Sequence, residues 1–271
     1  MTDLNTRQCA HQGEAKARPA LQGEEGRLIR AMLDSLARPE AMVEEVVFGE
    51  KFLAVVAGGR VGLSSLLGAA PDEPGLEEVR RAPGRTAAAL AENVTTDSPF
   101  CISLGLAAMN AANSPSPESL TSGKGVSAEE RIAQLGGKVG LVGEFPFVAS
   151  LRSKVDLHLF ELRDVPGAVP AHLWDETLAG LDVLAVTGTA LLTRRMAYFL
   201  TRARQATILV LGPSTPLSAS LFDYGVDYLC GSVVTEQERV LGGIRAGLPF
   251  HQVKKNGGIH FTNWTRQDLP G

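Results

Sequence analysis

The sequence has 271 residues, of which 44% are hydrophobic and 21% are charged, and its formal net charge is −4 at pH 7. This composition excludes intrinsic disorder of the whole chain, which requires low hydrophobicity or high net charge. The acidic balance also argues against a nucleic-acid partner, because nucleic-acid-binding proteins gain affinity by neutralising phosphates with basic residues.

Three cysteines, Cys9, Cys101 and Cys230, are spaced too widely to form a disulfide framework. We therefore expect reduced thiols and a cytoplasmic protein. The first residues lack the apolar core of a signal peptide, and no apolar run approaches the ~18 residues of a membrane span. The sequence thus predicts no membrane partner, and it leaves open whether the chain forms a homo-oligomer.

The first part of the chain predicts a flexible tail followed by a small α+β domain. Residues 1–24 are polar and show no periodicity, which is typical of a loose tail. From residue 26 onwards, apolar residues recur at helical spacing until Pro39. Residues 43–67 alternate apolar runs with Gly-containing turns and predict an antiparallel three-stranded meander. Helices are predicted over 74–81, 85–93 and 98–112, the last with Ser98 as its N-cap, so this domain spans residues 25–112.

Residues 113–126 (NSPSPESLTSGKGV) are rich in Ser, Pro and Gly and predict a linker between two domains. After the linker, Ser127 and Glu130 have the spacing of a capping box at the start of a helix. Short apolar runs then alternate with helical patterns, which indicates an α/β domain with a Rossmann-like, mainly parallel five-stranded sheet over 127–271. The five runs are 138–143, 155–161, 182–188, 207–212 and 226–234.

The order of these five strands in the sheet follows from the doubly wound pattern. Numbered along the chain, we expect them to lie side by side as 3-2-1-4-5. A helix over 191–205 carries four arginines that we place on its solvent-facing side: Arg194, Arg195, Arg202 and Arg204. A closing helix is predicted after residue 236, and residues 258–264 predict an edge strand.

Candidate ligand-binding residues follow the predicted strands, because ligands bind beyond the carboxyl ends of parallel strands. Glycines at these positions allow a ligand to approach the backbone, and hydroxyl and N–H groups can hold a carboxylate or a phosphate. The candidates are Glu144, Glu161, Thr187, Gly188, Thr189, Gly212, Pro213, Ser214 and Thr215.

Structural interpretations of these residues stay open beside the functional ones. Asn110 lies in an apolar helix, so its amide either satisfies nearby backbone groups or faces the second domain. Glu161 follows Gly143 by 18 residues, close to the spacing of a ribose-binding acid, but it also fits an ion-paired surface residue. The turn GPSTP (212–216) also fits a rigid connection that binds nothing.

Several common functional motifs are missing from the sequence. Gly140 and Gly143 alone do not complete the G-x-G-x-x-G fingerprint of dinucleotide binding, and neither a Walker A motif nor a G-x-S-x-G elbow occurs. The five histidines and three cysteines show no zinc-binding spacing, so the metal ligands, if any, are unknown at this point.

Six segments of the sequence resemble a known family, described as "putative heavy-metal chelation" proteins. They are GLAAMNA (105–111), KVGLVGEFPF (138–147), LFE (159–161), DVLAVTGTAL (182–191), LGPSTPLSASLFDYGVDYLCGSVV (211–234) and GLPF (247–250). The resemblance covers roughly residues 27–260 and implies an enolase-N-terminal-like domain, here 25–112, before the Rossmann-like domain. It also implies a site between the two domains, to which its motifs carry over Asn110, Glu144, Glu161, Thr187, Thr189, Ser214 and Thr215.

The sequence departs from the family pattern at two positions. Glu144 stands where the family often has His, and Thr193 stands where it often has Asn. The first difference replaces an imidazole by a carboxylate, which prefers harder metals. The resemblance suggests a transition metal or a metal complex as the cofactor, while this difference leaves the ligand set in doubt.

Three functions are compatible with the sequence and the resemblance. The first is a protein that binds a small-molecule or metal-chelate ligand between its domains, for metal homeostasis or metal-cofactor assembly. The second is an enzyme that condenses or hydrolyses a pterin-, flavin- or siderophore-like molecule, with Glu144 as the general base. The third is a methyltransferase-like enzyme with a nucleoside cofactor bound at Glu161. The sequence does not decide whether there is turnover.

Overall fold

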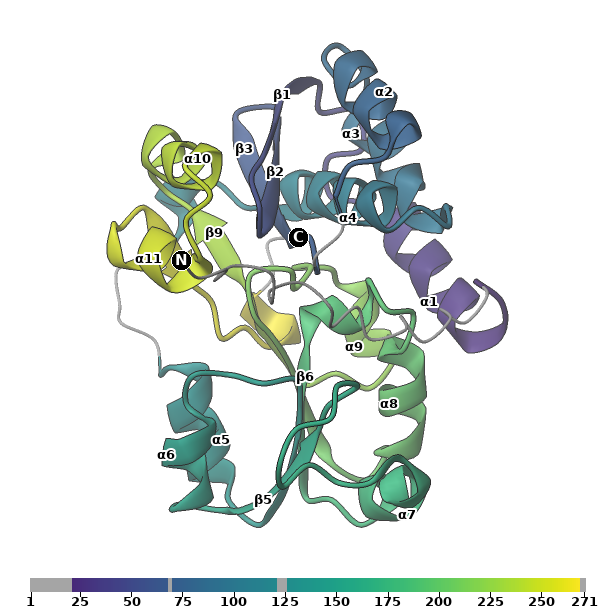
Figure 1. The fold of residues 1–271 in the computed structure, drawn as a ribbon, viewed down its shortest axis with the longest axis vertical. Helices are drawn as coiled ribbons and strands as arrows, with labels where there is room; N and C mark the ends of the chain where they lie inside the picture. Colours follow the sequence, from purple (N-terminus) through teal and green to yellow (C-terminus); the bar gives the residue numbers. More distant parts are fainter. Residues whose placement is uncertain (1–20, 68–69, 121–125, 269–271) are drawn as a thin grey trace, which may run out of the picture.

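The computed structural model describes residues 21–67, 70–120 and 126–268 of the chain. Its two main sheets are an antiparallel three-stranded sheet and a parallel five-stranded sheet, which lie in the upper and lower halves of Figure 1. Most of the predicted tail, residues 1–20, lies outside the described residues, as do residues 121–125 of the predicted linker. Within the described residues, no helix has both the length and the apolar character needed to cross a membrane.

The N-terminal part contains the predicted meander and helices. A long buried helix, α4, packs on strands β2 and β3, and its N-cap is confirmed, because Ser98 Oγ accepts a hydrogen bond from Cys101 N. The close packing requires Gly62, since a Cβ there would lie 2.1 Å from the carbonyl oxygen of Ala107. The elements are α1 (Gly23–Asp34), β1 (Val43–Phe48), β2 (Phe52–Ala57), β3 (Arg60–Ser65), α2 (Glu73–Arg81), α3 (Ala87–Ala91), η1 (Glu92–Thr95) and α4 (Pro99–Asn113).

The second part contains the parallel sheet with helices on both faces. The capping box of Ser127 and Glu130 at the start of α5 is confirmed. The elements are η2 (Pro117–Ser119), α5 (Ala128–Leu135), β4 (Lys138–Val142), α6 (Val148–Arg152), β5 (Asp156–Phe160), η3 (Ala171–Leu173), α7 (Trp174–Ala179), β6 (Val183–Thr187), η4 (Gly188–Ala190), α8 (Met196–Arg202), β7 (Thr207–Leu211), α9 (Ser220–Asp223) and β8 (Tyr228–Cys230).

The predicted order of the strands is wrong. The sheet has the order β5-β4-β6-β7-β8, which is 2-1-3-4-5 along the chain instead of 3-2-1-4-5. Strand β6 is buried at nearly every position, so it needs a neighbour on both sides, whereas β5 has an exposed Asp156 and a half-exposed His158. Polar positions of this kind are tolerated at a sheet edge. The chain therefore runs from β4 to β5 on one side and then crosses back to β6 on the other side of β4, which creates a switch point between β4 and β6.

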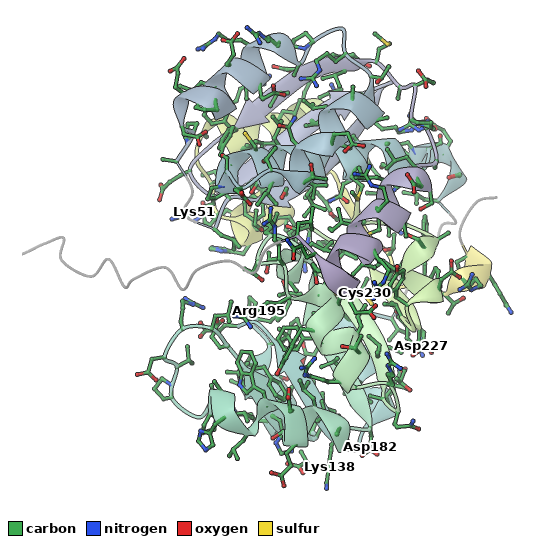
Figure 2. All side chains as sticks on the ribbon, turned by 90° about the vertical axis from the view of Figure 1, so that its right-hand side faces the viewer. Lys51, Lys138, Asp182, Arg195, Asp227 and Cys230 are labelled. Atoms are coloured by element: carbon green, nitrogen blue, oxygen red, sulfur yellow. The ribbon has the colours of Figure 1, made fainter. Side chains whose placement is uncertain are left out.

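The carboxyl ends of the parallel strands point toward the N-terminal part. Lys138 and Asp182 lie at the starts of β4 and β6, and Figure 2 shows them at the end of the molecule opposite the N-terminal part. There, Lys138 N donates a hydrogen bond to Asp182 Oδ2 at 2.8 Å. Arg195 lies toward the other end of the sheet, close to the N-terminal part. The carboxyl ends of the strands thus lie between the two parts of the molecule.

The last segment of the chain returns to the N-terminal sheet. The fifth predicted strand divides at Gly231 into β8 and β9 (Ser232–Val234), and β9 pairs antiparallel with β10 (Ile259–Phe261). The predicted closing helix is α10 (Gln237–Arg245), followed by α11 (Phe250–Lys255) and, after β10, by η5 (Arg266–Asp268). The apolar side chains of β9, α10 and α11 pack on strands β1 to β3, in a cluster that includes Val56, Leu63, Val240 and Ile244. Residues far apart in the sequence therefore complete one core.

Helix α1 joins the two parts on another side, where it packs on α8 and α9. Its Glu25 is buried (7% exposed), and Glu25 Oε2 accepts a hydrogen bond from Ala197 N at 2.7 Å. Burial raises the pKa of Glu25 to about 7, although the N–H groups of Ala197 and Met196 and the charge of Arg194 favour its ionised form. This contact fixes the first turn of α8 against the N-terminal part.

Candidate functional site

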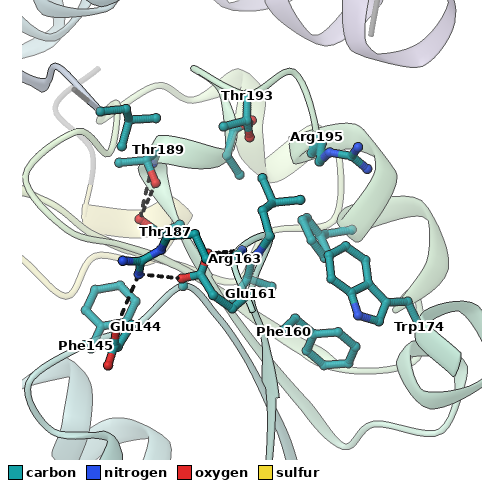
Figure 3. A pocket seen from close by; sticks show the side chains of 16 residues that line it. Glu144, Phe145, Phe160, Glu161, Arg163, Trp174, Thr187, Thr189, Thr193 and Arg195 are labelled. Carbon is teal, nitrogen blue, oxygen red and sulfur yellow. Dashed lines mark hydrogen bonds and ion pairs between the residues drawn. The ribbon is translucent and has the colours of Figure 1, made fainter. Parts of the chain in front are cut away.

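A cavity of about 520 Å³ lies at the carboxyl ends of β4, β5 and β6. Figure 3 shows it from close by, with side chains from the loops that follow these strands. It coincides with the switch point of the sheet, where open α/β sheets bind their ligands. The N-terminal part contributes Leu67, which follows strand β3. The size is that of a site for a small organic molecule.

One wall of the cavity is aromatic. Phe160 at the end of β5, Trp174 at the start of α7 and Phe199 in α8 pack against one another, with ring centroids 5.7 to 6.4 Å apart. The indole of Trp174 is held in place, because its Nε1 donates a hydrogen bond to Val169 O at 2.9 Å. The three rings are almost fully buried (Phe160 0%, Phe199 2% and Trp174 5% exposed), so they form a rigid apolar backing for this wall and leave little ring surface open.

The opposite wall carries a cluster of three charged side chains. Arg163 donates hydrogen bonds to Glu144 Oε2 at 3.2 Å and to Glu161 Oε2 at 3.1 Å (Figure 3). Glu161 Oε1 accepts hydrogen bonds from the N–H groups of Leu162 at 2.8 Å and Arg163 at 3.2 Å. Burial opposes ionisation of Glu161, but the hydrogen bonds and charge of Arg163 outweigh it and lower the pKa of this carboxyl.

The two carboxylates of this cluster differ in their accessibility. The side chain of Glu161 is 11% exposed and both its oxygens accept hydrogen bonds, so it anchors Arg163 and the turn after β5. The side chain of Glu144 is 53% exposed and lies at the cavity mouth. Between the two interpretations of Glu161 drawn from the sequence, these contacts favour the ion-paired structural acid over a ribose-binding residue.

Hydroxyl groups from the loop after β6 line another side of the cavity. Thr187 Oγ1 and Thr189 Oγ1 lie 3.0 Å apart, and Thr193 Oγ1 donates to Ala190 O at 3.2 Å. Gly143 adopts φ +93°, and a Cβ at this position would lie 3.1 Å from Thr187 Cγ2. Glycine therefore permits the turn after β4 to approach Thr187 closely.

Of the ten residues that the sequence proposed for the site, the structure brings four to the cavity. These four are Glu144, Glu161, Thr187 and Thr189. The GPSTP turn lies elsewhere, at the junction with the N-terminal part. Ser214 is 1% exposed, accepts a hydrogen bond from Ser65 N at 3.0 Å and donates one to Ser65 Oγ at 3.1 Å.

The other five residues are also absent from the cavity lining, although Gly212 lies near it, since a Cβ there would be 4.0 Å from Thr187 Oγ1. Gly188 packs against the GPSTP turn so closely that a Cβ added to it would lie 2.6 Å from the backbone of Ser214 and Thr215. Gly212 and Pro213 begin this turn. Asn110 Nδ2 donates to Leu63 O at 2.7 Å inside the N-terminal part. Between the two interpretations of Asn110, this bond favours the satisfaction of backbone groups.

Two arginines also line the cavity, Arg163 and Arg195, and neither is among the candidates drawn from the sequence. The prediction that four arginines share the solvent-facing side of one helix is wrong, because α8 begins only at Met196. Arg194 is buried, and its guanidinium donates to Asp97 Oδ1 at 2.9 Å and to Thr96 O. Arg195 lines the cavity. The sequence offers no clear signal for this helix start, because arginines are not favoured at the N-terminus of a helix and Arg195 makes no side-chain cap.

Two strained backbone positions flank the cavity. Among the residues that the structure describes, only Leu67 (φ +45°) and Arg194 (φ +53°) combine a side chain with a positive φ. Leu67 lines the cavity and its side chain is half-exposed, while Arg194 directly precedes Arg195. Left-handed conformations of non-glycine residues cost energy and tend to cluster at functional sites.

The side chains present do not fit a directly bound heavy metal. Over the described ranges, no three His, Cys, Asp or Glu side chains lie close enough together to hold a metal ion. The two carboxylates of the cavity both bond Arg163, and heavy metals prefer thiolate and imidazole ligands. Cys230 is buried away from the cavity, and burial raises the pKa of its thiol to about 12.

Two family profiles, both described as "Putative heavy-metal chelation", match residues 29–113 and 129–263. A protein of unknown function from the DUF364 family of Desulfitobacterium hafniense has a similar structure, with a TM-score of 0.77 and 23% sequence identity; the match covers 88% of this chain and 98% of that one. A second DUF364 protein of unknown function, from Pyrococcus horikoshii, matches with a TM-score of 0.70 and 19% identity, over 89% and 100% of the two chains. No curated protein matches the sequence.

Proposed function

Because the chain belongs to the family described as "Putative heavy-metal chelation", we propose that it binds its metal as a complex with a small organic chelator. The complex occupies the cavity at the carboxyl ends of β4, β5 and β6. Its organic part contacts the protein and supplies the metal ligands. The protein then acts in metal homeostasis or in the assembly of a metal cofactor.

The composition of the cavity carries this proposal. Apolar side chains, of which Leu67 and Phe145 are accessible, face charged and hydroxyl groups around a volume of about 520 Å³. An organic molecule can use both kinds of surface, whereas a bare metal ion would meet only two carboxylates that Arg163 already engages. The metal is therefore better accommodated inside a chelate than by protein side chains.

Native mass spectrometry of the protein as purified, with elemental analysis of the same sample, tests this proposal. We expect a retained small molecule, and metal only in proportion to it. Calorimetric titrations then compare Ni²⁺, Zn²⁺ and Fe³⁺ salts with the iron(III) complex of 2,3-dihydroxybenzoate. The proposal fails if a bare metal salt binds stoichiometrically to the native protein and a Glu144→Gln, Thr187→Val double variant loses this binding, because the cavity side chains would then bind the metal directly.

A second candidate function is turnover of the bound molecule by condensation or hydrolysis. Glu144 supports it, since it is the accessible carboxylate of the cavity and can accept a proton from a ligand. Glu144→Gln should then abolish turnover and leave ligand affinity largely intact. Equal losses of both would instead indicate a binding role for this residue. We do not propose nucleoside binding at Glu161, because both its oxygens are engaged.

A further inference from the structure

The cavity has a net negative cluster of side chains on one side and a single positive side chain on the other. Four charged residues of the described chain line it, and three of them form the cluster of Glu144, Glu161 and Arg163, which carries a net charge of −1. The fourth is Arg195. Figure 3 shows Arg195 and Glu144 on opposite sides of the cavity, with Arg195 on the same side as Trp174. The cavity therefore has an acidic end and a basic end, with an aromatic wall beside them.

The two cavity arginines differ in what they bind. Arg163 contacts two carboxylates. Arg195 forms no ion pair with any described residue, since no carboxylate oxygen lies within 4.0 Å of its guanidinium nitrogens. A guanidinium without an acidic partner inside a pocket is suited to a carboxylate, which it can bind through two parallel hydrogen bonds. Arg195 can thus hold an anionic group without first giving up a partner.

The backbone around Arg195 is held firmly. Arg195 N donates to Ala190 O at 2.9 Å. On one side Arg194 contacts Asp97 and Thr96, and on the other side Ala197 N donates to the buried carboxylate of Glu25. Both neighbouring contacts come from the N-terminal part. A binding group on a fixed backbone loses less conformational entropy when a ligand arrives.

From this arrangement we infer that the ligand is dipolar, with a carboxylate at Arg195 and an amine at Glu144, joined by an apolar body that contacts Leu67 and the small exposed part of Trp174. This inference rests on the proposed function, because it assigns the ligand class of the same cavity. An amino-carboxylate chelator fits it, since amine nitrogens and carboxylate oxygens are themselves metal ligands. Ligands with a single charge leave one end of the cavity unmatched and bind less tightly.

Three small probes that share one aromatic ring test the polarity of the cavity. 4-(Aminomethyl)benzoate carries both charges at opposite ends of its ring, 4-methylbenzoate carries only the anion, and 4-methylbenzylamine carries only the cation. Each is titrated into the ¹⁵N-labelled full-length protein, and the indole N–H signal of Trp174 is followed. The other tryptophan of the chain, Trp264, lies outside the cavity lining and serves as an internal control.

We expect the dipolar probe to bind at least about tenfold more tightly than either singly charged probe, which corresponds to ~1.4 kcal/mol. Arg195→Gln should weaken the dipolar probe and 4-methylbenzoate without affecting 4-methylbenzylamine. Glu144→Gln should weaken the dipolar probe and 4-methylbenzylamine only. Arg204→Gln, the same change at an exposed arginine outside this cavity, should leave all three affinities unchanged.

The outcomes separate this inference from the proposed function. If a singly charged probe binds at Trp174 as tightly as the dipolar one, the dipolar ligand is refuted and the cavity remains a binding site. The same holds if Arg195→Gln and Glu144→Gln affect all probes equally. If no probe at millimolar concentration shifts the Trp174 signal and the iron(III) complex also fails to bind, both proposals are refuted.

Discussion

The carboxyl edge of the parallel sheet contains two regions with similar residues, of which one is open and the other is covered by the N-terminal part. At β4 to β6, Glu144, Glu161 and the threonines surround an open cavity. Beyond β7, the GPSTP turn carries equally suitable hydroxyls, but Ser65 of the N-terminal part bonds Ser214 and closes this region. The residue types alone do not distinguish an open cavity from a packed interface. What separates them is which neighbouring segment covers each strand end.

Gly188 lies on the boundary between these two regions, and its replacement should have the largest effect. In Gly188→Ala, the new Cβ would lie 2.6 Å from the backbone of Ser214 and Thr215, so η4 and the GPSTP turn must separate. We expect a loss of about 3 kcal/mol or more in the free energy of unfolding, measured by urea denaturation. Gly242→Ala is the control, because no atom lies within 4 Å of its Cβ in helix α10. A stability loss no larger than that of the control would contradict the assigned packing.

Glu25 tests the second contact between the two parts, at the start of α8. Because burial raises the pKa of Glu25 from its ordinary 4.5 to about 7, the unfolded chain releases this proton first as the pH rises. Ionisation therefore destabilises the folded state progressively between about pH 4.5 and 7, by up to ~2–3 kcal/mol.

Glu25→Gln should remove this dependence. We expect the variant to gain stability over the native protein at pH 8 and to match it near pH 5, in urea denaturation at both values. A difference between the two proteins that is equal at both pH values would rule out titration of Glu25 as the cause.

Ser214→Ala sharpens the comparison between the closed and the open region. The variant leaves the part-buried N–H of Ser65 without its acceptor, so we expect a loss of about 1 kcal/mol in unfolding free energy. The affinity for 4-(aminomethyl)benzoate should not change. Thr187→Val should show the opposite pattern, with weaker probe binding and little effect on stability. A reduced probe affinity in Ser214→Ala would show that the GPSTP turn contributes to probe binding, contrary to its placement outside the cavity.

Leu67 should show the smallest effect on stability. Leu67→Gly relieves the left-handed backbone at φ +45° and removes a half-exposed side chain, so the unfolding free energy should change by less than ~1 kcal/mol. Probe affinity should fall, because the N-terminal wall of the cavity is lost. Leu67→Ala removes the same side chain but keeps the strain, so it should be less stable than Leu67→Gly and equally weak in binding. Unchanged affinity in both variants would exclude Leu67 from the site.

Much of the fold could be predicted from local patterns. The capping box at Ser127, the N-cap at Ser98, the meander and the parallel strands all depend on short-range spacing, and the structure contains them. The strand order depends on which strands have neighbours on both sides. The charged start of β5 contained this information, because Asp156 and His158 suit an edge strand.

The site was less predictable, because it depends on contacts between distant segments. Strand ends identified Glu144, Glu161, Thr187 and Thr189, which follow directly from the topology of the sheet. Ser214 is buried because it bonds Ser65, which lies 149 residues away in the sequence. No local sequence pattern predicts that contact. Arg195 was assigned to a helix face because the sequence does not mark the exact residue at which α8 begins.

The return of the last segment to the N-terminal sheet affects how the protein can be made. Strands β1 to β3 emerge early from the ribosome, but the apolar face that receives α10 and α11 stays uncovered until residues 237–255 follow. Helix α4 can already cover one face of this sheet, but the second face stays uncovered while the parallel sheet is still being synthesised. During translation, this exposed β-surface is the part of the nascent chain most in need of protection from aggregation.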